Sequence, residues 1–327
     1  MRKRINIFSK FVKIAKMYQE LLLKQIRSKI GDKSLNDEIA NVLNISYDAA
    51  HRRTSMKSKF SLEESLVLAK FYNISLNSFM ESDNQIIAKK TKPIRTVTDL
   101  LNYFDDALHL LNDFKINKET EVYYSAKDIP FFYTISDSVL SRFKLFVWMN
   151  LLNEKDFMQP FDDFKLERYS DKSEDLKNLY ENLNVTEIWN NTTISSILNQ
   201  VLFYSEIEIL SKETAKLILD ELKILIKSIE KKAENENKNF HIYAHDILIL
   251  NNSILFKNEE KSSLFVPYNM FGYMMTDDQS TCDDALNFFQ HQIKNSRLLN
   301  ASGNRDKKLF FNKMYEQIEN LKQKLQI

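Results

Sequence analysis

The stretch that decides the fold of the amino-terminal part is Ser34–Phe79, SLNDEIANVLNISYDAAHRRTSMKSKFSLEESLVLAKFYNISLNSF. It predicts four short helices, because serines stand where helices are expected to begin. Ser34 is followed three residues later by Asp37, and Ser61 by Glu64. Both pairs match the capping box, in which a hydroxyl and an acidic side chain satisfy the free N–H groups of a helix start.

A tight connection, Leu43–Ser46, separates the first two of these helices, and Ser46 and Ser75 each open a further helical stretch. A helix of about ten residues, a three-residue turn and a second short helix form the helix-turn-helix arrangement. The common use of that unit is to lay its second helix in the major groove of DNA.

The stretch resembles the Cro and lambda-repressor-like (XRE-type) DNA-binding domain over roughly residues 18–82. Ala40 and Ala69 match the small residues that let helices approach, Ile45 matches the buried turn aliphatic, and Ser46 matches the cap of the recognition helix. Asn44 takes the turn position that usually holds Gly, and Asn tolerates left-handed backbone angles. Two residues depart from the family pattern: Arg53 replaces an aliphatic residue, and Met56 replaces a frequent Gly.

The recognition helix is predicted over about Ser46–Ser55. Its helical periodicity turns Ala49 and Ala50 toward the first helix or the core. The side chains that it directs toward base edges are Tyr47, Asp48, His51 and Arg52. The full predicted DNA-binding set is Ser46, Tyr47, Asp48, His51, Arg52, Arg53, Lys57 and Lys59. Lys57, Lys59 and a basic arm from Arg2 to Lys16 are expected to contact phosphates.

The distribution of charge supports a polyanionic partner at the amino-terminal end. Residues 1–95 hold 19 Lys and Arg against 9 Asp and Glu, a surplus of +10, whereas the whole chain is at +1 and the remainder is therefore at −9. A basic module joined to an acidic one is typical of a protein that binds nucleic acid through one part only.

Composition excludes several classes of function. The three glycines of this 327-residue chain are too scattered to build a phosphate-cradling loop, and one cysteine excludes an intrachain disulfide. No apolar run reaches the ~18–20 residues that span a bilayer, and the amino-terminal stretch lacks the features of a signal peptide. We therefore expect a cytoplasmic protein without a membrane partner.

The rest of the chain is predicted to be mostly helical. The fold class expected is mainly α: a helix-turn-helix domain with its basic arm over residues 1–82, a linker over 83–97, and a larger helical region over 98–327. Periodicity predicts helices from Asp99 to Phe114 and from about Val185 to Ser228, while the segment around Tyr123 is left undecided between extended and irregular structure. Short β-rich runs after a possible subdivision near 231–239 predict a small α+β unit at the end.

Two apolar stripes in the helical region are candidate dimer seams or bundle faces. The first is Ala215, Ile218, Leu222, Leu225 and Ile229, and the second is Met314, Ile318, Leu321 and Leu325. A single module of this kind contacts about half an operator, so we expect a homodimer.

These observations favour a sequence-specific DNA-binding transcriptional regulator whose carboxyl-terminal region dimerises or senses a small-molecule or protein effector. One alternative is a phage-like repressor or antitoxin whose carboxyl-terminal region docks a protein partner, and another is an enzyme with a DNA-targeting module. His241 and His245 are four residues apart, but their β-like surroundings separate them by about 13 Å. We predict no catalytic residues, no metal site and no cofactor. The operator, the effector and the sign of regulation are not readable from the sequence.

Overall fold

The computed structural model describes residues 18–79, 86–115, 119–152, 159–165, 171–234, 239–270, 272–300 and 304–327. The chain divides into two compact units, Met1–Ile87 and Ala88–Ile327. This division falls inside the predicted linker, residues 83–97. The possible subdivision near residues 231–239 does not separate compact units, because residues 88–327 form one unit.

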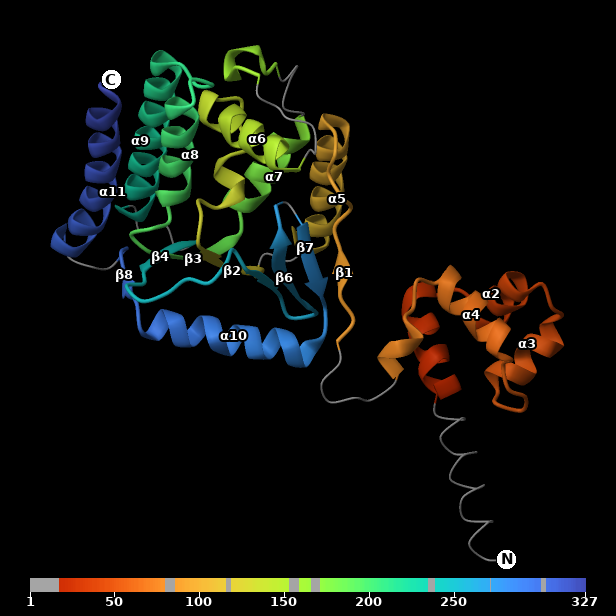
Figure 1. Cartoon of the computed structure of the whole chain (residues 1–327). Helices are drawn as coiled ribbons and strands as arrows, with labels where there is room; N and C mark the ends of the chain where they lie inside the picture. Colours follow the sequence, from red (N-terminus) through yellow and green to blue (C-terminus); the bar gives the residue numbers. More distant parts are fainter. Residues whose placement is uncertain are drawn as a thin grey trace, which may run out of the picture. The chain divides into compact units, whose positions relative to one another are not determined.

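The amino-terminal unit is a small bundle of helices (Figure 1). A leading helix covers residues 18–30 of the described chain. It is followed by α2 (Leu35–Leu43), α3 (Tyr47–Thr54), α4 (Leu62–Phe71) and the 3₁₀ helix η1 (Leu76–Phe79). Ser34, Ser46 and Ser61 accept hydrogen bonds from backbone N–H groups at the starts of α2, α3 and α4, as the sequence predicts.

A separate core holds these helices together. The leading helix turns one face inward because Leu22, Ile26 and Ile30 recur every four residues. These side chains pack in one apolar cluster with Ile39 of α2 and Leu68 of α4. The amino-terminal unit therefore buries its own hydrophobic residues.

The carboxyl-terminal unit is built on a mixed eight-stranded sheet, within the described residues, with the order β1-β7-β6-β5-β2-β3-β4-β8. The strands are β1 (Lys89–Lys90), β2 (Glu121–Ala126), β3 (Asn184–Trp189), β4 (Phe240–Ala244), β5 (Ile254–Lys257), β6 (Ser262–Asn269), β7 (Gly272–Thr276) and β8 (Arg297–Leu298). Strands β2, β3 and β4 are parallel, with Val122 opposite Val185 and Ile188 opposite Tyr243. The other pairings are antiparallel.

Helices cover both faces of this sheet (Figure 1). They are α5 (Val97–Lys115), α6 (Val139–Leu152), α7 (Asp171–Glu181), α8 (Ser195–Glu206), α9 (Lys212–Glu234), α10 (Gln279–Lys294) and α11 (Asn304–Leu325), with short 3₁₀ turns η2 (Phe131–Tyr133) and η3 (Phe161–Asp163). Helix α10 lies along one face, where Cys282 and Phe289 pack with Ile188, Leu255 and Leu264 of the strands. The remaining helices lie on the opposite face.

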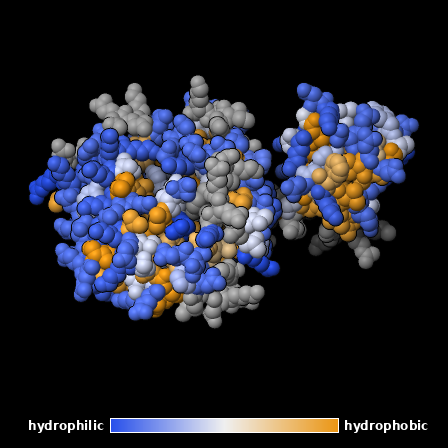
Figure 2. All heavy atoms as spheres, turned by 90° about the horizontal axis from the view of Figure 1, so that it is seen from above, coloured by the Kyte–Doolittle hydropathy of each residue, from blue (hydrophilic) through white to orange (hydrophobic). Residues whose placement is uncertain are grey.

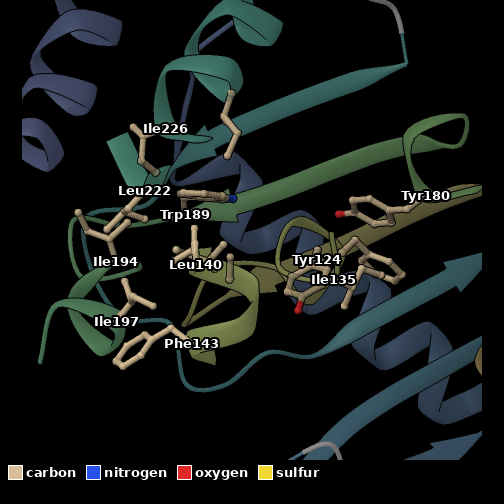
Figure 3. Close-up of a cluster of buried hydrophobic side chains, with 14 of the residues drawn as sticks. Tyr124, Ile135, Leu140, Phe143, Tyr180, Trp189, Ile194, Ile197, Leu222 and Ile226 are labelled. Carbon is tan, nitrogen blue, oxygen red and sulfur yellow. The ribbon is translucent and has the colours of Figure 1, made fainter. Parts of the chain in front are cut away.

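The main core lies between the sheet and that second group of helices. Figure 3 shows part of it, in which α9 contributes Leu222 and Ile226, β3 contributes Trp189 and α6 contributes Phe143. Alternation along the strands sorts the side chains: Val185 and Trp189 of β3 belong to this core, whereas Ile188 belongs to the cluster under α10.

The predicted fold class is wrong. The chain is a mixed α/β protein, and not a mainly α protein with one small α+β unit at its end. The short runs near the carboxyl-terminal end do form strands, but they add to β2 and β3 in a single sheet. The helix predicted from Val185 begins instead as β3. The undecided segment around Tyr123 is β2.

Both candidate dimer seams belong to the core of one chain. Ala215, Ile218 and Leu222 on α9 and Met314 and Ile318 on α11 are fully buried in the same apolar cluster. The stripes therefore pack within the carboxyl-terminal unit and leave no exposed seam for a second copy.

Candidate nucleic-acid interface

The turn between α2 and α3 has a defined backbone geometry. Asn44 adopts left-handed angles, with φ 52° and ψ 49°, and Ile45 donates its N–H to the carbonyl of Ala40 at 3.0 Å. This is the Schellman arrangement that ends a helix. The Ser46 hydroxyl then accepts the N–H of Ala49 at 3.3 Å and starts α3. The connection fixes the angle between α2 and α3 without a glycine.

The same device recurs where α4 ends. Asn73 is left-handed, with φ 50°, and Ile74 donates its N–H to the carbonyl of Ala69 at 2.8 Å. In both places the sequence reads Asn-Ile-Ser, and an alanine stands five residues before the isoleucine. The repeated tripeptide thus has one structural role, which is to end a helix and turn the chain.

Helix α3 has a buried face and an open face. Ala50 is fully buried and Ala49 half-buried, as predicted, whereas Tyr47, His51 and Arg52 are exposed. Asp48 is exposed as well. The rings of Tyr47 and His51 lie parallel, with centroids 6.4 Å apart. The open face therefore presents an aromatic pair, a carboxylate and a guanidinium.

An asparagine on α2 supports the aromatic pair. The Asn36 amide donates to the Tyr47 hydroxyl at 3.1 Å and lies 3.4 Å from Nδ1 of His51. Its carbonyl accepts the Thr54 hydroxyl at 2.5 Å. The sequence reasoning missed Asn36. Its position two residues after the helix cap Ser34 gave no local signal, because its role depends on the packing of two helices.

Arg53 has an internal partner. Its Nε and a terminal nitrogen donate to the two carboxylate oxygens of Glu64 at 2.9 and 2.6 Å, and its other terminal nitrogen donates to the carbonyl of Ala49 at 3.0 Å. A bidentate pair of this kind is strong and directional. The guanidinium holds the pKa of Glu64 below its usual value. Arg53 therefore joins α3 to α4.

Glu64 also belongs to the start of α4. Its carboxylate accepts the backbone N–H of Ser61 at 3.0 Å, while its own N–H donates to the Ser61 hydroxyl at 3.1 Å. This is the capping box that the sequence predicts. One carboxylate thus caps α4 and binds Arg53 of α3.

The segment after α3 carries the predicted phosphate contacts. Met56 takes a left-handed conformation, with φ 61°. Lys57 and Lys59 follow and are both exposed. Arg52, Lys57 and Lys59 are thus exposed basic residues on and just after α3. The basic arm from Arg2 to Lys16 lies outside the described residues.

Gln19 on the leading helix holds this segment in place. Its amide donates to the carbonyls of Arg53 and Ser58 at 2.8 and 3.0 Å, and its own carbonyl accepts the N–H of Phe60 at 3.1 Å. Gln19 is buried. Sequence reasoning did not identify this residue either, because its three partners lie 34 to 41 positions away.

The carboxyl-terminal unit contains a second candidate site, a surface cavity of about 680 Å³ beside α9. Its polar lining includes Tyr133, Ser138, Lys177, Glu221 and Lys232, and its apolar lining includes Leu140, Ile224, Leu225 and Ile229. Such a mixture of apolar walls and a few polar groups is typical of sites for small molecules.

A buried carboxylate lies behind the cavity. Glu187 of β3 accepts hydrogen bonds from the hydroxyls of Tyr133 and Tyr180 at 2.7 and 2.8 Å and from Nε1 of Trp189 at 2.7 Å. Burial raises the pKa of Glu187, and these hydrogen bonds and the nearby Lys232 oppose that rise. Tyr133 lines the cavity and also binds Glu187, so the cavity wall is connected to the core of the sheet.

His241 and His245, the two histidines considered as metal ligands, differ from each other in their surroundings. His241 lies within β4, and His245, just after it, is buried with Nδ1 2.9 Å from the Ser296 hydroxyl. Among the described residues, no three His, Cys, Asp or Glu side chains are arranged to hold a metal ion. Within the residues that the structure describes, no helix combines the length and apolar character needed to cross a membrane.

Comparison with known proteins adds no assignment: no family model, no curated protein and no solved structure matches this chain.

Proposed function

We propose that this chain is a sequence-specific regulator of transcription that binds double-stranded DNA by laying α3 in the major groove. One observation carries the proposal. Helix α3 is anchored by a buried alanine, a capped turn and the Arg53–Glu64 pair, yet its Tyr47, His51 and Arg52 side chains are exposed on one face. A rigidly held short helix with an open polar face suits the reading of base edges.

The predicted contacts take distinct roles in this proposal. Arg52 donates to guanine, and Asp48 accepts from cytosine or excludes other bases. Tyr47 and His51 present a braced aromatic pair to the groove, and Lys57 and Lys59 bind phosphates. The Ser46 hydroxyl already accepts the N–H of Ala49, so we assign Ser46 to capping α3 rather than to reading a base. Arg53 acts by positioning α3, because Glu64 holds its guanidinium.

The carboxyl-terminal unit is proposed to sense an effector. The cavity beside α9 supports this role, since it combines hydroxyl, amine and carboxylate groups with an apolar wall. We also propose that the protein acts as a homodimer in the cytoplasm, with its two recognition helices in successive major grooves about 34 Å apart.

Selection of bound duplexes from a random DNA library by the full chain tests the main claim. We expect one enriched motif, and binding that weakens with salt by a slope of about −0.9 per phosphate neutralised. If every duplex binds equally, the chain is not a sequence-specific regulator.

Two neighbouring arginines provide a matched comparison on the selected duplex. Arg52→Gln and Arg53→Gln remove the same charge from the same helix. We expect Arg52→Gln to lose about 5- to 150-fold in affinity, the equivalent of ~1–3 kcal/mol, and to relax the preference at one base pair with no change in thermal stability. Arg53→Gln should instead lower the thermal stability of the amino-terminal unit. Equal loss by Arg52→Gln on selected and scrambled duplexes would reassign Arg52 to a phosphate.

A further inference from the structure

The outward face of α4 is unusually apolar for the surface of a small unit. Leu62 is 69%, Leu66 52%, Val67 47% and Phe71 65% exposed. Figure 2 shows apolar side chains gathered on the visible face of the amino-terminal unit. Together the four residues leave on the order of 400 Å² of apolar surface exposed.

Helical geometry divides this face into two apolar edges and a charged centre. Leu68, Ala69 and Tyr72 are buried and fix the inward side of α4. At 100° per residue, the opposite side has Glu63 and Lys70 at its middle. Leu62 and Leu66 form one edge, and Val67 and Phe71 form the other. Glu63 and Lys70 are both exposed.

This arrangement is complementary to itself. A two-fold axis between Leu66 and Val67 makes two α4 helices antiparallel and sets each of these two residues beside its own copy. The same axis sets Glu63 of each copy opposite Lys70 of the other. An isologous contact requires this kind of self-complementarity. Opposite charges at the centre fix the register, and the apolar edges supply buried area.

We propose that the outward face of α4 is the docking surface for a second copy of this chain, in an antiparallel α4–α4 contact. The inference rests on the proposed function only for the role of DNA in stabilising the contact. A patch of this size is about half of the ~800 Å² that each partner buries in a standard stable interface. The contact therefore forms weakly in free protein and strongly when two half-sites hold two copies side by side.

Cysteine cross-linking tests the contact directly. Leu66→Cys should form an intermolecular cross-link under mild oxidation, giving a band at twice the chain mass of 38.7 kDa. Leu217→Cys on α9 is the matched control, because Leu217 is 53% exposed against 52% for Leu66. The native Cys282 is buried and serves as a common background. A Leu66→Cys yield no higher than that of Leu217→Cys, with and without DNA, would overturn the proposal.

Exchange of the central charges tests the register. In the Leu66→Cys background, Lys70→Glu places two carboxylates against each other in both halves of the contact and should lower the cross-link yield at least fivefold. Adding Glu63→Lys should restore it, with hydrogen exchange of peptides from α4 confirming that this helix remains folded. Lys216→Glu, an exposed site on α9, changes the net charge equally and should leave the yield unchanged. Failure of the double variant to recover while α4 stays helical would exclude the antiparallel register.

The outcomes separate this inference from the proposed function. A cross-link that forms without DNA, in a chain that selects no duplex, supports the contact and refutes the regulator. A chain that selects one half-site, binds it as a monomer and fails to cross-link keeps the regulator and refutes the contact. Protection of Leu66→Cys from a maleimide reagent in the monomeric full chain would mean that another part of the same chain covers this face, which also refutes the contact.

Discussion

Replacing Gln19 by alanine should unfold the amino-terminal unit at lower denaturant while leaving the carboxyl-terminal unit unaffected. The side chain is buried and makes three hydrogen bonds to the α3–α4 connection, at 2.8, 3.0 and 3.1 Å. Each such bond contributes a net ~1 kcal/mol, so the variant should lose about 3 kcal/mol. A unit of this size has a total stability of about 4–10 kcal/mol, so the loss is a large fraction of it.

The two tryptophans make this effect separable. Trp148 in α6 and Trp189 in β3 both lie in the carboxyl-terminal unit. In a urea titration of the full chain, tryptophan fluorescence therefore follows that unit, whereas hydrogen exchange in peptides from α3 and α4 follows the amino-terminal one. Gln19→Ala should lower the urea midpoint measured by hydrogen exchange and leave the midpoint measured by fluorescence unchanged. Gln25→Ala, an exposed site on the same helix, should shift neither. Equal shifts in both probes, or an equal loss in Gln25→Ala, would refute the reasoning.

Two further predictions concern carboxylates that accept several hydrogen bonds. Because Arg53 lowers the pKa of Glu64, the stabilisation it provides is complete above the unfolded pKa of ~4.3 and is lost as pH falls through the lower folded value. The difference in stability between the native chain and Glu64→Gln should accordingly be constant near neutral pH and should become smaller below pH ~4. Hydrogen exchange of the α3 peptides measures this difference. A difference that does not depend on pH would contradict the ion pair. Glu187→Leu should destabilise the carboxyl-terminal unit by about 3 kcal/mol, because three buried donors lose their acceptor, and the fluorescence of Trp189 reports it; a neutral change would mean that relief of the buried charge compensates.

Local signals predicted the amino-terminal unit well because they act within a few residues. The serine caps at Ser46 and Ser61 and the left-handed Asn44 each depend on neighbours within five positions. The burial of Ala50 follows from helical periodicity in the same way. These features fixed the bounds of α3, whose cap Ser46 and final residue Thr54 lie within one residue of the prediction.

The central sheet was not predictable from such signals. Strands β2 and β3 are covered on both faces, so they lack the alternation of apolar and polar residues that identifies half-buried strands. Glu187 places a carboxylate inside β3, and its partners Tyr133 and Tyr180 lie 54 and 7 positions away in other elements. The two exposed residues of β1 within the predicted linker carry no strand signal at all.

The candidate interface depends on contacts that no local pattern shows. The residues that face outward on α3 were predicted from periodicity, but the amide of Asn36 that braces Tyr47 and the amide of Gln19 were not. Both act across helices, at separations of 11 and 34 to 41 positions. Periodicity therefore identifies which side chains of α3 are exposed, whereas three-dimensional packing determines how firmly they are held.

Arg53 and Met56, the two residues that differ from the pattern of the resembled family, lie at the end of α3 and in the turn after it. They also affect how α4 is held. Left-handed angles at a non-glycine residue such as Met56 cost about 1 kcal/mol, and the bonds from Gln19 to the carbonyls on either side of it offset that cost. Arg53 then couples α3 to Glu64, which caps α4. An aliphatic residue at that position would pack α3 against the core without this directional link to α4. Since the pair fixes α4 relative to α3, the proposed α4–α4 contact would set the distance between the two α3 helices. Arg53→Met should for this reason loosen the preferred spacing of half-sites while leaving the preferred bases unchanged.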